Sequence, residues 1–178
     1  MTNGKESFID KKIQEDLSPT RNLSGLHLKI VAAIAIIWSL FQLWYASPFP
    51  FMFGVGLFKG LPARAIHLGF ALLLAFLIFP LNKKNGKIGI VDVALACMAF
   101  FACIYIYFFY DQIVDRGGIL LDLDLNFLGS QFVIPIELII GSFGIIALLE
   151  STRRVIGIPL VIVAIAFLLF SFFGQYFP

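Results

Sequence analysis

The sequence predicts an all-α integral membrane protein with about five transmembrane helices, and its composition, its apolar segments and its charge distribution each point to that class. Hydrophobic residues make up 60% of the 178 positions and charged residues 13%, whereas soluble domains hold roughly 45–50% apolar and 25% charged residues. A net charge of +2 gives no basic excess that would neutralise a nucleic-acid backbone. The composition therefore excludes a soluble domain and a nucleic-acid-binding protein.

Residues 1–29 form a polar stretch of mixed charge ahead of the first apolar segment. The stretch lacks the apolar core and the small-residue cleavage site of a secretory signal. We therefore expect two parts, an N-terminal arm over residues 1–29 and a single transmembrane helical domain over residues 30–178.

Five continuous apolar segments make up this domain. They show no period-two alternation of the kind found in outer-membrane strands, so helices are the structure that satisfies their backbone in lipid. At about 1.5 Å per residue each helix would extend roughly 26–28 Å, close to the ~30 Å hydrocarbon core. The predicted helices cover residues 30–46, 65–81, 93–110, 132–149 and 155–173.

The connection between the last two predicted helices leaves two alternatives open. Only the sequence Glu150-Ser-Thr-Arg-Arg154 separates them, which is compatible with a tight hairpin. Alternatively, residues 150–158 lie along the membrane surface and Pro159 opens a shorter last crossing.

Lys and Arg are distributed unequally over the two sides that these helices define. Cytoplasmic loops near helix ends retain positive charge, and most of the 13 positive residues fall on one side: Lys5, Lys11, Lys12, Arg21, Lys29, Lys83, Lys84, Lys87, Arg153 and Arg154. The opposite side holds Lys59, Arg64 and Arg116. The N-terminus is therefore predicted to be cytoplasmic and the C-terminus to lie outside.

Two segments on the outer side have an unusual composition. Residues 48–64 are rich in Phe, Pro and Gly and almost uncharged, which suits a segment lying in the membrane interface. Residues 111–131 carry Asp111 and Asp115 with further acidic and leucine residues, so we expect an acidic outer loop. This loop either docks another protein or is an ordinary solvated connection.

Ionisable residues within or beside predicted spans are expected to face a protein interior. Glu137 lies inside the fourth predicted helix near its outer end, and we hypothesise that it pairs with His67 or Arg64 at the outer end of the second. The alternative is that Glu137 reaches outward to water past Pro135.

Glu150, Arg153 and Arg154 form an i, i+3, i+4 cluster at the cytoplasmic boundary. Such a cluster supports a helical turn. It either anchors the helix to lipid phosphate or contacts another subunit.

No arrangement of residues in the sequence calls for catalysis or a metal. The two His and two Cys are scattered without the spacing of a metal or thiol site, and no phosphate-binding loop is present. We therefore predict no catalytic, metal-binding or substrate-binding residue and expect that the chain is not an enzyme.

Four sequence signatures in register resemble the TAXI-type permeases of tripartite ATP-independent periplasmic (TRAP) transporters. They are RAIHLGF at 64–70, the pair YD at 110–111 with RGG at 116–118, LLESTRRVIG at 148–157 and IAFLLFSFFG at 165–174. In many members of that family this region is fused to a large transport domain, so the chain resembles the small membrane subunit as a separate polypeptide or a fragment of a fusion.

The resemblance implies a multi-pass protein of the bacterial inner membrane that belongs to a sodium-coupled secondary transporter, a symporter, for organic acids. A periplasmic TAXI-type binding protein would deliver the substrate, and the large partner subunit would hold the sodium and substrate sites and move elevator-fashion. This chain would be the stator, in contact with that subunit and with membrane lipid and without a cofactor of its own. The resemblance assigns structural or subunit-interface roles to Arg64, His67, Glu150, Arg153 and Arg154, and we add Glu137. We add contact with the binding protein as a hypothesis for Asp111 and Asp115.

Two other functions are the alternatives, a self-contained small carrier or channel and a membrane-embedded anchor enzyme. A carrier would show broken helices and several polar groups at the membrane midplane. An enzyme would show clustered His, Cys or carboxylate residues near one surface. Neither pattern is present in the sequence.

Overall fold

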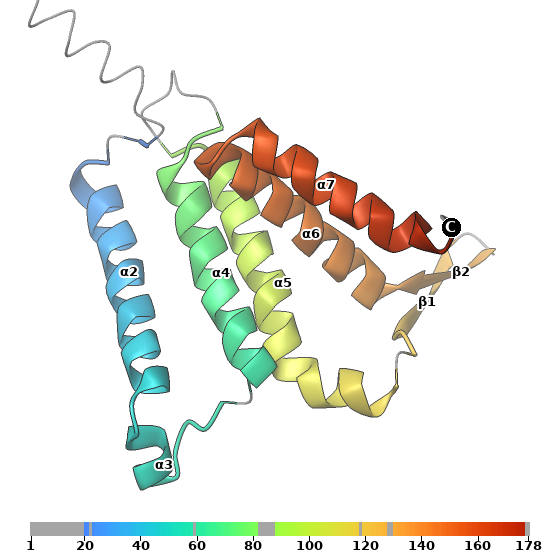
Figure 1. Cartoon of the computed structure of the whole chain (residues 1–178), viewed down its shortest axis with the longest axis horizontal. Helices are drawn as coiled ribbons and strands as arrows, with labels where there is room; N and C mark the ends of the chain where they lie inside the picture. Colours follow the sequence, from blue (N-terminus) through green and yellow to red (C-terminus); the bar gives the residue numbers. More distant parts are fainter. Residues whose placement is uncertain are drawn as a thin grey trace, which may run out of the picture.

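A computed structural model of the chain describes residues 20–21, 23–58, 60–81, 88–117, 119–127 and 130–176. These residues form long helices and one two-stranded hairpin (Figure 1). In chain order the elements are α2 (Gly25–Ala46), α3 (Phe49–Phe53), α4 (Gly60–Ile78), α5 (Ile90–Asp115), β1 (Asp122–Phe127), β2 (Ser130–Pro135), α6 (Ile136–Val155), α7 (Ile158–Phe173) and the short 3-10 helix η1 (Gly174–Tyr176). Most of the predicted arm, residues 1–19, lies outside the described residues.

Each of the five predicted helices has a counterpart in the structure, namely α2, α4, α5, α6 and α7. Among the described residues, α2, α4 and α5 are long and apolar enough to cross a membrane. Helix α6 has charged residues near both ends, and α7 is apolar but only 16 residues long. The chain is thus a helical, membrane-embedded protein that passes through the bilayer more than once.

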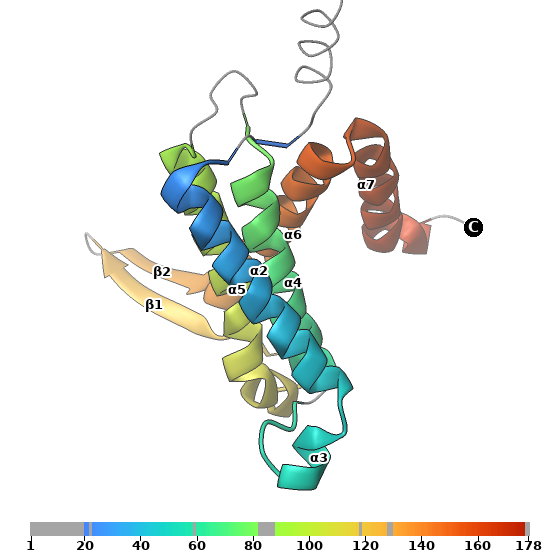
Figure 2. The same cartoon turned by 90° about the vertical axis from the view of Figure 1, so that its left-hand side faces the viewer.

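Helix α4 lies at the centre of the fold, between α2 on one side and α5 and α6 on the other (Figures 1 and 2). Apolar residues of α4 and α5 make up most of the core, together with Val31 of α2 and Ala147 of α6. Gly69 lets α4 and α5 approach closely, because a Cβ atom there would lie 3.2 Å from the Cβ of Cys103 and 3.2 Å from a ring carbon of Phe100. Helix α7, by contrast, packs beside α6 and has no buried residue.

The segment from 111 to 135 departs from the predicted acidic loop and helix start. Helix α5 continues to Asp115, so Asp111 and Asp115 lie on a helix, and the paired strands β1 and β2 follow. The sequence signal for β1 is the period-two alternation DLDLNF, which is typical of a strand. Residues 130–135 pair with β1 as strand β2, so the helix predicted from residue 132 begins at Ile136.

The predicted interfacial segment, residues 48–64, contains the short helix α3 and the first turn of α4. Gly54, with φ +65°, ends α3 in the left-handed region that favours glycine. The chain then turns back so that the ring of Phe58 lies 5.5 Å from that of Phe41 on α2. A compact aromatic turn therefore joins α2 to α4.

A tight turn joins α6 and α7, as the hairpin alternative predicts. Residues 150–155 continue α6, and the N–H groups of Ile156 and Gly157 both donate to the carbonyl of Thr152, at 2.9 and 3.2 Å. Gly157 has φ +114°, a conformation that L side chains rarely adopt, and α7 begins at the next residue.

Candidate functional site

The carboxylate of Asp92, in the first turn of α5, is buried. Arg21, from the segment before α2, donates to one oxygen at 2.5 Å. Arg154, near the end of α6, donates to the other oxygen at 2.8 Å. All three side chains are at most 6% exposed. We call Arg21, Asp92, Glu150, Arg153 and Arg154 the Asp92 cluster.

The last turn of α4 supports this cluster through its backbone carbonyls. Such carbonyls have no partner within the helix, and here Arg21 donates from Nη1 to Leu77 at 3.0 Å and from its backbone N–H to Ile78 at 2.8 Å. Arg154 donates to the carbonyl of Phe79 at 3.2 Å and lies over the ring of Phe76. The two arginines thus tie the ends of four segments to one carboxylate.

The predicted i, i+3, i+4 set on α6 is present and divides into an inward and an outward arginine. Glu150 accepts two hydrogen bonds from Arg153, at 2.7 and 2.8 Å, and one from Arg154 at 2.8 Å. The Arg153 side chain is 44% exposed and the Arg154 side chain 2%. Arg154 is therefore the buried arginine that α6 contributes to the Asp92 cluster, and Arg153 is the exposed one.

The contact between Arg21 and Asp92 was not predicted from the sequence. Asp92 carried a usable signal, an acidic residue in the first turn of an otherwise apolar helix, which costs several kcal/mol unless it is paired. Arg21 carried none, because it is one of several positive residues in the arm.

The predicted pair between Glu137 and His67 or Arg64 is wrong. Glu137 binds Arg116 instead, and it also accepts hydrogen bonds from the Tyr105 hydroxyl at 3.4 Å and the Leu121 N–H at 3.2 Å. The physical reason is that α5 extends beyond its predicted end, so that the turn after it brings Arg116 back over the start of α6. The alternative of Glu137 reaching into water is wrong as well, because its side chain is only 10% exposed.

His67 instead faces α2. Its Nδ1 atom accepts a hydrogen bond from the indole N–H of Trp38 at 3.3 Å and contacts the side-chain amide of Gln42. An indole N–H only donates, so Nδ1 is the acceptor in the contact with Trp38. Arg64, one turn before His67, is exposed. His67 therefore contributes to the contact between α2 and α4, and Arg64 lies one turn away from it.

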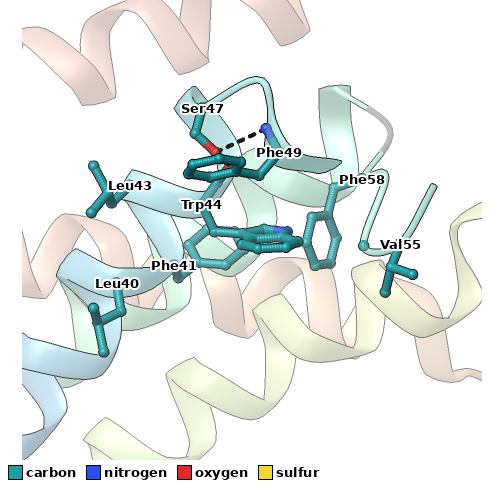
Figure 3. Close-up of a pocket in the computed structure, with 9 residues that line it drawn as sticks. Leu40, Phe41, Leu43, Trp44, Ser47, Phe49, Val55 and Phe58 are labelled. Carbon is teal, nitrogen blue, oxygen red and sulfur yellow. Dashed lines mark hydrogen bonds between the residues drawn. The ribbon is translucent and has the colours of Figure 1, made fainter. Parts of the chain in front are cut away.

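Apolar grooves lie between the described elements, and two of them contain aromatic or polar side chains. One, of about 620 Å³, lies at the junction of α2 with the aromatic turn; Figure 3 shows the rings of Phe41, Trp44, Phe49 and Phe58 gathered around it. The other, of about 380 Å³, lies between α4, α5 and α6, and Glu137 and Tyr105 are the polar residues at one end of it.

The described residues contain no group of three or more His, Cys, Asp or Glu side chains that could hold a metal ion. Asp111 and Asp115, proposed as contacts for a binding protein, are exposed on the last turns of α5. The carboxylates that are enclosed, Asp92 and Glu137, both bind arginines.

Comparison with family models, curated proteins and solved structures gave no match to this chain.

Proposed function

We propose that the chain is the small membrane subunit of a TAXI-type TRAP transporter and acts as the stator for a large, elevator-type transport subunit. In this proposal a periplasmic binding protein delivers an organic acid, and the large subunit carries it inward with sodium. The proposal rests on the four signatures that resemble that family and on the distribution of polar groups described above.

The observation that carries the stator role is that the enclosed carboxylates of the described residues are already neutralised by arginine. Asp92 binds two arginines at one end of the helices, and Glu137 binds one at the other. A carrier needs carboxylates or carbonyls that are free to coordinate an ion, typically at a broken helix near the membrane midplane. Each long helix here is instead continuous from end to end. Such an arrangement suits a rigid support more than an ion pathway.

The Asp92 cluster also supports the predicted topology of five crossings. It joins the segment before α2, the start of α5 and the end of α6 at one end of the helices. These are the three regions in which the sequence concentrates Lys and Arg, the side that the positive-inside rule assigns to the cytoplasm. We therefore propose a cytoplasmic N-terminus, a periplasmic C-terminus and the bacterial inner membrane as location.

The stator role further requires a surface for the large subunit, and the exposed apolar faces of α2 and α7 offer one. Helix α2 exposes residues such as Ile36, Leu40 and Leu43, and α7 exposes Phe167 and Phe170. Lipid tails are as apolar as the side chains of a partner helix, so the exposed faces alone do not distinguish lipid from a partner subunit. The experiment therefore has to detect the partner directly.

The test is co-expression of the tagged chain with a large TAXI-type permease subunit from the same organism, followed by affinity purification and reconstitution into liposomes. We expect the two subunits to co-purify. Sodium-dependent uptake of an organic acid should require both subunits and the binding protein. Liposomes with the large subunit alone are the control and should show no uptake. Uptake by this chain alone would establish a self-contained carrier, and failure of the subunits to co-purify would also contradict the proposal.

A further inference from the structure

The β1–β2 hairpin has two faces of opposite character. Residues paired across an antiparallel ladder share a face of the sheet, and the two faces alternate along each strand. The register therefore defines an apolar face, which consists of Leu123, Leu125, Phe127, Ser130, Phe132 and Ile134. It also defines an acidic face, which consists of Asp122, Asp124, Asn126, Gln131, Val133 and Pro135. The hairpin is thus amphipathic.

The base of the hairpin is fixed to the start of α6. The Ile136 N–H donates to the Leu121 carbonyl at 3.1 Å, and the Leu121 N–H donates to the Glu137 carboxylate at 3.2 Å. Glu137 in turn binds Arg116. From this base the strands extend sideways, away from the helices (Figures 1 and 2). The hairpin therefore lies across the direction of the helices and does not prolong them.

This base lies near one boundary of a bilayer. At about 1.5 Å per residue, the stretch of α6 from Glu137 to Arg154 extends about 26 Å. Arg154 belongs to the Asp92 cluster at the other end of the helices, and a hydrocarbon core is ~30 Å thick. Helix α5 leads to the same level, because it extends about 35 Å from Asp92 to Asp115. With the Asp92 cluster at one boundary, the hairpin lies at the opposite one.

Little of the described chain covers the hairpin. Its strands pair with each other and make few contacts with the helices. A two-stranded hairpin is at best marginally stable in water and becomes stable when an apolar face is covered. The residues on either side of it, Ile119, Leu120, Leu138 and Ile139, are apolar and exposed. The apolar surface of the helices therefore continues to the hairpin at this level.

The strand edges favour the membrane interface over the membrane core. Each strand pairs along one edge only among the described residues, so the N–H and C=O groups of the other edge need hydrogen bonds from water or headgroups. Carboxylates such as those of Asp122 and Asp124 also need water. A hairpin that lies flat on the interface satisfies both needs and still covers its apolar face with hydrocarbon.

We propose that the β1–β2 hairpin lies flat on the membrane surface opposite the Asp92 cluster. The apolar face contacts the lipid hydrocarbon, and the acidic face is in water. The occupant of the apolar face is thus the bilayer itself. The inference requires that the chain is embedded in a membrane and does not depend on the transporter role.

The test is electron paramagnetic resonance of the full-length chain in palmitoyl-oleoyl phosphatidylcholine liposomes, with Cys97 and Cys103 replaced by alanine. A nitroxide label is attached to Leu125→Cys or to Asp124→Cys, adjacent positions on opposite faces that control for each other. Power saturation measures collisions with oxygen, which dissolves in hydrocarbon, and with nickel ethylenediaminediacetate, which stays in water. We expect the label at Asp124 to collide with the nickel reagent severalfold more often than the label at Leu125, and oxygen to show the reverse order. Equal access of the nickel reagent to both labels would overturn the inference.

A second measurement separates lipid from a protein partner and does not use the labelled variants. Photoreactive benzoylphenylalanine in place of Leu125 should form an adduct with the mass of a phospholipid in the membranes of the expressing cells. The same substitution at Leu138, which is exposed on α6, is the control for lipid contact and should form that adduct as well. An adduct with a protein at Leu125 would mean that a partner chain covers the apolar face, and it would overturn the inference.

Discussion

At the scale of single residues, the neighbouring Arg153 and Arg154 allow a buried ion pair to be compared with an exposed one on the same helix. Both bind Glu150, but Arg154 is enclosed and also binds Asp92, whereas nearly half of the Arg153 side chain is exposed. Removing one partner of a buried ion pair leaves an uncompensated charge and costs about 3–5 kcal/mol. An exposed pair contributes about 0.2–1 kcal/mol.

We therefore predict that Arg154→Gln lowers the free energy of unfolding by several kcal/mol and Arg153→Gln by about 1 kcal/mol or less. The measurement is unfolding of the purified chain in mixed micelles by titration with sodium dodecyl sulfate. Asp92→Asn should resemble Arg154→Gln, because it leaves Arg21 and Arg154 facing each other without a carboxylate. Similar losses for the two arginine variants would show that Arg154 is not held as described.

Glu137 leads to a second prediction, which separates the pair found in the structure from the pair expected from the sequence. In double-mutant cycles, groups in contact show interaction energies of about 0.5–3 kcal/mol, whereas distant groups are additive. We expect Glu137→Gln and Arg116→Gln to be non-additive in the same unfolding measurement. Glu137→Gln and His67→Ala should be additive, and the opposite result would restore the sequence-based pairing.

The contacts of these residues differ in how well the sequence predicts them. Glu137 stood out because a carboxylate within an apolar segment needs a partner. Its partner could not be identified, because helix ends carry the least periodic signal, and the length of α5 decides where Arg116 lies. The i, i+3, i+4 contacts of Glu150 were predictable because the helix itself fixes them. The bond between Arg21 and Asp92 joins residues 71 positions apart and follows only from the packed fold.

At the scale of elements, the contact of α4 with α5 depends on a glycine. A methyl group at Gly69 would lie 3.2 Å from Cys103 and Phe100, whereas one at Gly141 would meet nothing. Overpacking costs about 1–3 kcal/mol, and replacing a helical glycine by alanine gains about 1 kcal/mol. Gly69→Ala should therefore lower the free energy of unfolding and Gly141→Ala should raise it or leave it unchanged. Stabilisation by both substitutions would show that the two helices have room to move apart.

The helices were predictable and the hairpin was not, for a physical reason. Long apolar segments exclude other structures in lipid, so the five helices followed from hydropathy, with boundary shifts where polar residues continue a helix. The β1–β2 hairpin contains few residues, and its alternation DLDLNF was interpreted as an acidic loop because leucines between aspartates also occur in solvated segments. Residues 122–127 form a strand because they pair with residues 130–135, and this pairing partner cannot be read from the sequence of one strand alone.

At the scale of the whole molecule, the number of crossings is decided by α6 and α7. If only α2, α4 and α5 cross, everything after α5 lies on the outer side. If α6 and α7 also cross, the turn between them returns to the cytoplasm, with the exposed Arg153 beside it, and the C-terminal end lies outside. Arg153 and Gln175 therefore lie on the same side of the membrane in the first case and on opposite sides in the second.

We predict that single cysteines at Gln112 and Gln175 react with a membrane-impermeant maleimide in intact spheroplasts, and that a cysteine at Arg153 reacts only after the membrane is opened. The native Cys97 and Cys103 are first replaced by alanine, and the variant without cysteines is the control. Gln112 is exposed on α5 and reports the outer side in both cases, so it calibrates the labelling. Labelling of Arg153→Cys from outside would contradict five crossings, and it would also contradict the contact of Arg154 with Asp92, because Asp92 lies at the opposite end of α5 from Gln112. Protection of Arg153→Cys together with labelling of Gln175→Cys requires both α6 and α7 to span the membrane, although α7 has only 16 residues. Thinning of the bilayer around a short helix costs a fraction of a kcal/mol per Å, so this length is compatible with a crossing.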